Sequence, residues 1–183
     1  MPVRVETYEQ VALEDGDAQW ELVCGSLRRK PPMTFVHGGV IRELHLQLVR
    51  QLDAAAFVVD ASSARLRVST GSYYVPDLVV IARALTQRGR SEHPDRLEVY
   101  DEPMPLVVEV WSPSTGEYDV ETKLQEYQRR GDREIWRIHP YERTLTAWQR
   151  QPDGTYTEVL HRDGVVQPAS LPAVRIDLAW LFA

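Results

Sequence analysis

The segment PLVVEVWSPST (residues 105–115) decides the fold, because it places one acidic residue inside an otherwise apolar run. Leu106–Val110 is short, apolar and rich in valine, which predicts a buried strand. Burying an unpaired carboxylate is costly, so Glu109 is expected to be paired, protonated or bound to a cation. Side chains alternate along a strand, so Glu109 is expected on the opposite face from Val108 and Val110.

A second acidic residue, Asp77, stands directly before another apolar stretch that ends in Val79-Val80-Ile81. This stretch also predicts a buried strand. If the two strands are neighbours, Asp77 and Glu109 converge at one end of the sheet. Two convergent carboxylates favour a Mg²⁺ site that backbone carbonyls and water complete.

The polar segment that starts at Asp119 and ends at Arg130 predicts a helix, with Asp119 as its N-cap. Lys123 lies on this helix, and Tyr127 lies one turn further along the same face. An ammonium group near two carboxylates balances their charge. It can also orient or deprotonate an attacking water, or stabilise a phosphate in the transition state.

Each of these residues also has a structural interpretation. A Pro-Asp pair before a strand is often only a turn. Glu109 could form a buried ion pair with Arg137 or Lys123, and Lys123 and Glu126 could lie on a solvated helix face. His37 could contact a phosphate, but a helix cap or a surface position is the simpler expectation.

Around this centre, the pattern predicts an α/β fold with a mixed sheet rather than a doubly wound one. Leucine and isoleucine recur at helical spacing between residues 38 and 52. A hairpin is predicted near the N-terminus and another near the C-terminus, the latter around Pro152-Asp153-Gly154. The strands are predicted at residues 20–29 (the first hairpin), 57–59, 64–69, 79–81, 106–110, 134–138, 144–149 and 156–160. Residues 85–102 are expected to form a loop or a short exposed helix, and the apolar segment 174–182 is expected to dock on the body.

Composition narrows the class of protein. A chain of 183 residues is expected to form a single domain over residues 1–183. Its net charge of −6 counts against a protein that coats nucleic acid non-specifically. The one cysteine, Cys24, is expected to be a small buried apolar residue. The sequence has no signal-peptide stretch and no apolar run of about 18 residues, so we expect a cytoplasmic protein without contact to a membrane.

Several motifs resemble one known family. They are WELVCGSLRRKPP (20–32), His37 with the helix that follows, YVPDLVVI (74–81), PLVVEVWSPST (105–115) and DVETKLQEYQRRGDREIWRIHP (119–140). Together they resemble the Uma2 family of restriction-endonuclease-like proteins, over residues 8–148. The segment 105–115 is the most specific of these matches.

The resemblance implies the fold of the PD-(D/E)xK nuclease superfamily, with a metal held by Asp77 and Glu109. In the superfamily's usual pattern a lysine stands two residues after the glutamate, where this chain has Trp111. The family moves the lysine to the helix, which corresponds to Lys123. The resemblance also implies that Glu21 is a further acidic member of the site and that Tyr127 supports it.

The leading hypothesis is therefore an endonuclease that hydrolyses phosphodiester bonds of DNA with Mg²⁺ or Mn²⁺, with Asp77, Glu109 and Lys123 as its catalytic core. A catalytically silent binding or assembly module is the alternative, and the net charge and the displaced lysine motivate it. Hydrolysis of RNA or nucleotides by the same site is a third interpretation. Cleavage of two strands needs two sites, so a homodimer is plausible. A track for the nucleic-acid backbone could include Arg28, Arg29, Lys30, Arg65, Arg67, Arg129 and Arg130.

Overall fold

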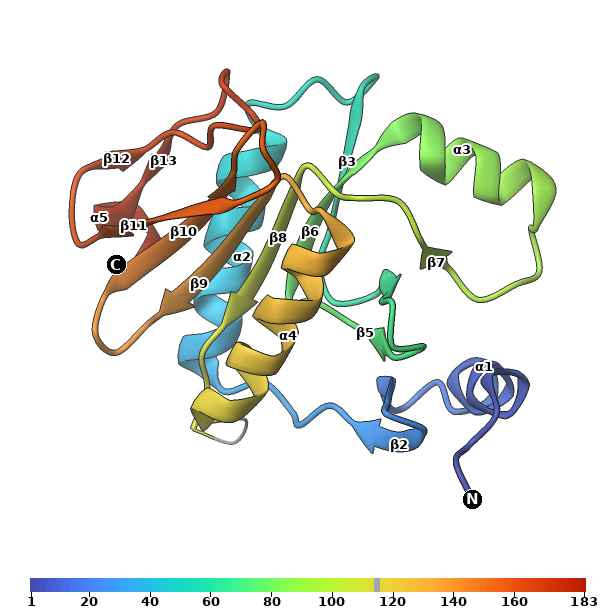
Figure 1. Cartoon of the computed structure of the whole chain (residues 1–183). Helices are drawn as coiled ribbons and strands as arrows, with labels where there is room; N and C mark the ends of the chain where they lie inside the picture. Colours follow the sequence, from blue (N-terminus) through green and yellow to red (C-terminus); the bar gives the residue numbers. More distant parts are fainter. Residues whose placement is uncertain (114–115) are drawn as a thin grey trace.

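The computed structural model describes the backbone of residues 1–113 and 116–183, and the side chains of residues 1–113 and 121–183. Its helices in this part of the chain are α1 (Val5–Glu14), α2 (Phe35–Val49), α3 (Arg83–Glu92), α4 (Gly116–Arg130) and α5 (Leu178–Leu181). The fold is mixed α/β, with helices on both faces of a central sheet (Figure 1).

The central sheet has six strands in the order β11-β10-β9-β8-β6-β3. Its strands are β3 (Phe57–Asp60), β6 (Leu78–Ala82), β8 (Leu106–Val110), β9 (Glu134–His139), β10 (Thr144–Arg150) and β11 (Tyr156–His161). Only the β8–β9 pair is parallel; α4 forms the crossover between these strands, and the other neighbours are antiparallel. This is the predicted mixed sheet, and β10 and β11 form the hairpin predicted around Asp153.

A second sheet has the order β2-β1-β5-β4-β7. Its strands are β1 (Trp20–Val23), β2 (Ser26–Arg29), β4 (Arg65–Arg67), β5 (Tyr73–Tyr74) and β7 (Val99–Tyr100). The sequence predicted the β1–β2 hairpin but not that it joins three further strands. Of these, β4 lies within the strand predicted at residues 64–69, whereas β5 and β7 are two residues long, too short for their alternation to stand out.

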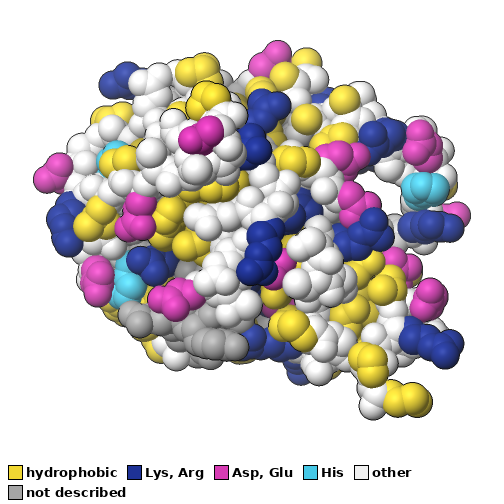
Figure 2. Space-filling view, viewed as in Figure 1, with side chains coloured by type: hydrophobic (Ala, Val, Ile, Leu, Met, Phe, Trp, Pro, Cys, Tyr) yellow, Lys and Arg dark blue, Asp and Glu magenta, His cyan; other side chains and the backbone are white. Residues whose placement is uncertain are grey.

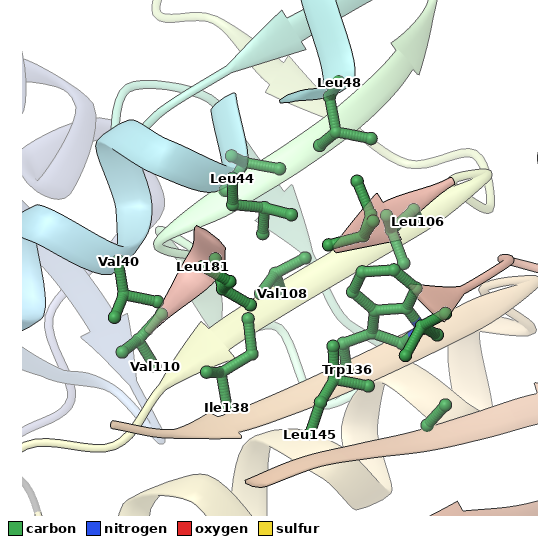
Figure 3. Close-up of a cluster of buried hydrophobic side chains, with 14 of the residues drawn as sticks. Val40, Leu44, Leu48, Leu106, Val108, Val110, Trp136, Ile138, Leu145 and Leu181 are labelled. Atoms are coloured by element: carbon green, nitrogen blue, oxygen red, sulfur yellow. The ribbon is translucent and has the colours of Figure 1, made fainter. Parts of the chain in front are cut away.

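Two apolar layers cover the faces of the central sheet. Side chains that alternate along β8 and β9 pack with α2 and with the C-terminal segment; Figure 3 shows Val40, Leu44 and Leu48 of α2 beside Val108, Ile138 and Leu181. On the other face, Val107 and Ile135 pack with Tyr127 of α4 and with Tyr74 of the second sheet. The apolar segment 174–182 therefore docks on the body as predicted. Within this segment, β13 (Ile176–Asp177) pairs with β12 (Val165–Val166) in a small two-stranded sheet.

Three local predictions differ from the structure. Cys24 is exposed rather than buried, because it occupies the hairpin turn with a φ of 48°. Residues 85–102 contain most of α3, which is the short exposed helix expected there, but also β7, which was not predicted. Helix α4 begins at Gly116, three residues before Asp119, and the N-cap interaction predicted for Asp119 lies outside the described side chains.

Candidate functional site

The ends of β6 and β8 bring Asp77 and Glu109 together. The two strands are antiparallel, with Leu78 opposite Val108, so Asp77 and Glu109 stand one step beyond that pair. The carboxylate Oδ2 of Asp77 accepts a 2.8 Å hydrogen bond from the backbone N–H of Val110, next to Glu109. The two strands are thus neighbours in the sheet, as expected, and both carboxylates line one cavity.

Asp77 is buried and makes hydrogen bonds through both of its oxygens. Besides the Val110 N–H, Oδ2 contacts Nε2 of His37 at 3.2 Å, and Oδ1 accepts from Nζ of Lys30 at 2.9 Å. Burial alone raises the pKa of Asp77, but Lys30 and His37 outweigh burial and hold the pKa well below its ordinary value. Asp77 is therefore an ionised carboxylate inside the protein, and the simple turn interpretation does not describe it.

Glu109 has a different electrostatic environment. Its Oε1 accepts a 2.7 Å hydrogen bond from the hydroxyl of Tyr127 and lies 3.4 Å from Nζ of Lys123. The pKa of Glu109 is raised to about 7, mainly by burial; Lys123 acts to lower this pKa, and the neighbouring charge of Asp77 acts to raise it. Two carboxylates in one pocket thus have pKa values that move in opposite directions.

Of the two ion-pair partners expected for Glu109, the structure has Lys123. Arg137 faces Glu109 across the β8–β9 pair, but its guanidinium lies over the ring of Trp148, 5.4 Å from the ring centre.

Lys123 of α4 reaches the strand ends from the side of the second sheet. Its Nζ donates to Oε1 of Glu21 at 2.8 Å and lies 5.4 Å from the ring centre of Tyr74. Its side chain is only 4% exposed, so the solvated-face interpretation is wrong for Lys123. It is also wrong for Glu126, which is buried and accepts from Arg129.

Glu21 enters the site from the N-terminal hairpin. It is buried on β1, and its Oε1 also accepts a 2.8 Å hydrogen bond from the backbone N–H of Val75. Through Lys123, Glu21 is linked to Glu109. Tyr127 contacts Glu109 directly and Glu21 reaches it through Lys123, while the roles that the family resemblance implies for both residues stay predictions.

His37 lies inside the site rather than at the protein surface. It is buried, and its Nε2 contacts both Oδ2 of Asp77 and the carbonyl oxygen of Val110, the latter at 3.1 Å. The cap of α2 is Thr34, whose Oγ1 accepts from the backbone N–H of His37. The cap and surface interpretations of His37 are therefore wrong: the first turn of α2 aims its imidazole at Asp77.

Lys30 is the site residue that sequence reasoning missed, since it was assigned only to a general basic track. Its Nζ donates to the carbonyl of Val75 at 2.8 Å and to Asp77 at 2.9 Å. One signal was available: the chain has only two lysines among its 21 basic residues, Lys30 and Lys123. Both line the same cavity.

Trp111 stands two residues after Glu109, at the position that the sequence resemblance singled out for a lysine in related nucleases. Its indole stacks on the ring of His139, with ring centres 4.4 Å apart, and it also meets Tyr141 edge to face. Position 111 therefore supplies no amine to Glu109, and Lys123 approaches Glu109 from α4 instead.

The cavity has a volume of about 40 Å³ and opens between the N-terminal hairpin and the start of α2. A single water needs about 10–15 Å³, so the cavity has room for a cation with a few waters. Asp77, Glu109 and the Val110 carbonyl offer oxygen ligands, the type that Mg²⁺ and Mn²⁺ prefer. Among the described residues, no group of three or more His, Cys, Asp or Glu side chains could hold a metal. The donors therefore fit a cation that keeps much of its water shell, as Mg²⁺ does.

The basic residues expected to form one track lie in different places in the structure. Arg28, Arg29 and Lys30 line the cavity. Arg67 instead forms an ion pair with Asp101, and Arg130 is buried against Asp132. In Figure 2 the basic and acidic side chains alternate over the visible face rather than forming one basic surface. Of the expected track, Arg28, Arg29 and Lys30 are therefore the residues that lie at the cavity.

Comparison with known proteins agrees with the fold. The chain matches the Uma2 family, described as "Putative restriction endonuclease", over residues 5–179. It is also similar to the crystal structure of "a putative nuclease belonging to DUF820" from Anabaena variabilis ATCC 29413. That similarity has a TM-score of 0.74 and 17% identity and covers 90% of this chain and 89% of that chain. At this identity the similarity is one of fold alone. No curated protein matches the chain.

The mixed sheet flanked by helices and the family match together place the chain among restriction-endonuclease-like proteins. The chain belongs to the Uma2 family. In the part of the chain that is described, no helix has the length and apolar character needed to cross a bilayer.

Proposed function

We propose that this protein is a nuclease that hydrolyses phosphodiester bonds of DNA with Mg²⁺ or Mn²⁺ held by Asp77 and Glu109. One observation carries the proposal: two buried carboxylates from adjacent strands line one small cavity. A hydrogen bond from the backbone N–H of Val110 to Asp77 holds Asp77 next to Glu109. Neither carboxylate has an evident need to be buried for folding alone, because apolar residues pack well at such positions.

The surrounding residues prepare the two carboxylates for this role. His37 and the Val110 N–H fix Oδ2 of Asp77, so this carboxylate keeps one orientation. Tyr127 fixes Oε1 of Glu109, and Lys123 offsets the negative charge of Glu109 and Glu21. A bound divalent cation would polarise the phosphate and lower the pKa of a water molecule. The chain's own contribution is to hold the ligands in place before substrate arrives.

The proposal is tested by cleavage of plasmid DNA and of single-stranded DNA with and without Mg²⁺ or Mn²⁺. Wild type is expected to cleave only with the cation, and Asp77→Asn is expected to lose cleavage. Asp153→Asn is the matched control, because Asp153 is an exposed carboxylate in the β10–β11 turn. A wild type without cleavage, or equal cleavage by Asp77→Asn, would contradict the proposal. An RNA strand in the same assay distinguishes RNA hydrolysis from DNA hydrolysis.

A silent binding or assembly module is the second candidate, and one observation favours it. Each carboxylate already has an ammonium partner, Asp77 with Lys30 and Glu109 with Lys123. Four such groups can simply neutralise one another in the folded protein. Calorimetric titration with Mn²⁺ separates the candidates, because a module without a metal role takes up no cation at this site.

Cutting both strands of a duplex needs two such sites, and we propose that a homodimer supplies them. Sedimentation of the protein with and without a DNA duplex tests this point. A monomer that nicks one strand at a time is the result that would contradict the dimer and leave the proposed chemistry intact.

A further inference from the structure

Lysine use in this chain is confined to the site. Of 21 basic residues, nineteen are arginines and two are lysines. Both lysines line the cavity of Asp77 and Glu109. Arginine presents a wide planar fork, whereas lysine carries a compact charge with three donors that can turn toward a small target. The two ammonium groups meet different surroundings, so they are expected to do different work.

Lys123 is enclosed by its own protein. Its Nζ contacts Glu21 at 2.8 Å and Glu109 at 3.4 Å, and its side chain is 4% exposed. A phosphate beside this ammonium would also lie beside two carboxylates, which repel it. The surroundings of Lys123 therefore suit a residue that holds Glu109 and Glu21 in place.

Lys30 has a more open position. Two of its three N–H donors go to Val75 and Asp77 among the described residues, which leaves one for a ligand. Its side chain is 13% exposed, and among the described residues its ion-pair partner is the carboxylate of Asp77, whose charge a cation on Asp77 would offset. Arg28 and Arg29 line the same cavity and add positive charge near it.

The backbone also holds Lys30 in position before any ligand binds. Its N–H donates to the carbonyl of Gln19 at 2.8 Å, directly beyond the β1–β2 ladder. Pro31 and Pro32 follow, and a proline restricts the preceding residue to extended conformations. A side chain that starts from a fixed backbone loses less entropy when it contacts a ligand.

We propose that Lys30 is the residue that contacts the substrate phosphate, and that Lys123 is a positioning residue that keeps Glu109 and Glu21 in place. This inference rests on the proposed nuclease function, since it names the substrate contact of the same site. The amine that faces the substrate is then Lys30, directly after the N-terminal hairpin, and not Lys123 on α4.

Two lysines make a direct test possible, because ¹³C-lysine labelling gives Cε–Hε signals from only two side chains. Lys30→Arg and Lys123→Arg assign them by loss of one signal each. A short DNA duplex is then titrated with Ca²⁺ in place of Mg²⁺, so that binding is observed without turnover. The Lys30 signal is expected to shift and the Lys123 signal to stay. A shift of Lys123 alone, or of neither lysine while DNA binds, overturns the inference.

Binding as a function of salt gives an independent measurement. Lys30→Gln is expected to weaken binding of the duplex and to reduce the slope of log K against log salt by about 1, as for one lost phosphate contact. Lys30→Arg restores the slope. Arg162→Gln, which removes an exposed charge outside the cavity, is the matched control and leaves the slope unchanged. An unchanged slope in folded Lys30→Gln contradicts the inference.

Metal binding distinguishes this failure from failure of the proposed function. Lys30→Gln is expected to retain calorimetric Mn²⁺ binding, because Lys30 is not a ligand, whereas Asp77→Asn is expected to lose it. If wild type binds Mn²⁺ and cleaves DNA but Lys30→Gln binds DNA normally, only the role of Lys30 is wrong. If wild type binds neither Mn²⁺ nor DNA, the proposed function falls and the inference falls with it.

Discussion

The carboxylate of Asp77 accepts a 2.8 Å hydrogen bond from the backbone N–H of Val110. This bond joins the start of β6 to the end of β8, where the ladder between the two strands has already stopped at Leu78 and Val108. It holds Asp77 beside Glu109 and leaves the Val110 carbonyl to His37. The pairing of the two strands thus fixes the relative position of the two carboxylates, without the help of a mobile loop.

Replacing Asp77 tests this coupling. In Asp77→Ala the Val110 N–H loses its acceptor, and, among the described residues, Lys30 and His37 each lose the Asp77 carboxylate and keep only a carbonyl, that of Val75 and of Val110 respectively. Leaving one partner of a buried charged network alone costs about 3–5 kcal/mol, so we expect a loss of this order in the free energy of unfolding. Urea denaturation of Asp77→Ala and of the Asp153→Ala control measures it. A loss in Asp77→Ala no larger than in the control would show that the network carries no stability.

The pH dependence of stability tests Glu109. Its pKa is raised from 4.5 to about 7 in the folded protein, so the folded state holds this proton more tightly than the unfolded state does. The favourable contribution is full below the unfolded pKa and is lost as pH rises through 7. Glu109→Gln has no such loss, so its advantage over wild type should grow between about pH 5 and pH 8, by up to about 3 kcal/mol.

Metal-free urea denaturation at several pH values measures this difference. The range stays above the ordinary pKa of Asp77, because a carboxylate with a lowered pKa has the opposite dependence and loses stability only in acid. An advantage of Glu109→Gln that is the same at both ends of the range would mean that Glu109 is ionised throughout.

Tyr127→Phe tests the support behind Glu109. It removes the hydroxyl that donates to Oε1 of Glu109 at 2.7 Å but keeps the ring, which packs edge to face with Tyr74. We expect a loss of about 1–2 kcal/mol in the free energy of unfolding, because one buried hydrogen bond is removed. We also expect weaker Mn²⁺ binding, since Glu109 loses its fixed orientation. Tyr141→Phe, at an exposed position, is the control. Unchanged Mn²⁺ affinity in Tyr127→Phe would show that the Tyr127 hydroxyl does not contribute to metal binding.

Much of the central sheet could be predicted from local pattern. Leu106–Val110 forms β8 with the same bounds, and Glu109 points where strand alternation placed it, away from the layer of Val108 and Val110. Long apolar strands carry a strong signal because nearly every residue is buried. The acid pair followed from the assumption that these strands are neighbours.

The remainder depends on contacts between distant parts of the chain. Lys30 meets Asp77 across 47 residues, and Glu21 meets Lys123 across 102. Nothing near Lys30 in the sequence distinguishes it from Arg28 and Arg29, so only its rarity as a lysine could have marked it. His37 was expected at the surface because a histidine in the first turn of a helix usually lies there, whereas α2 packs this turn against the strand ends.

Joint binding of a divalent cation by Asp77 and Glu109 can be observed by anomalous diffraction from a crystal soaked in Mn²⁺, with an Asp77→Asn crystal as the control. We expect one Mn²⁺ peak within ligand distance of both carboxylates in wild type and none at that place in Asp77→Asn. A wild-type crystal with no peak there, and with Lys30 and Lys123 still bound to the two carboxylates, would contradict it.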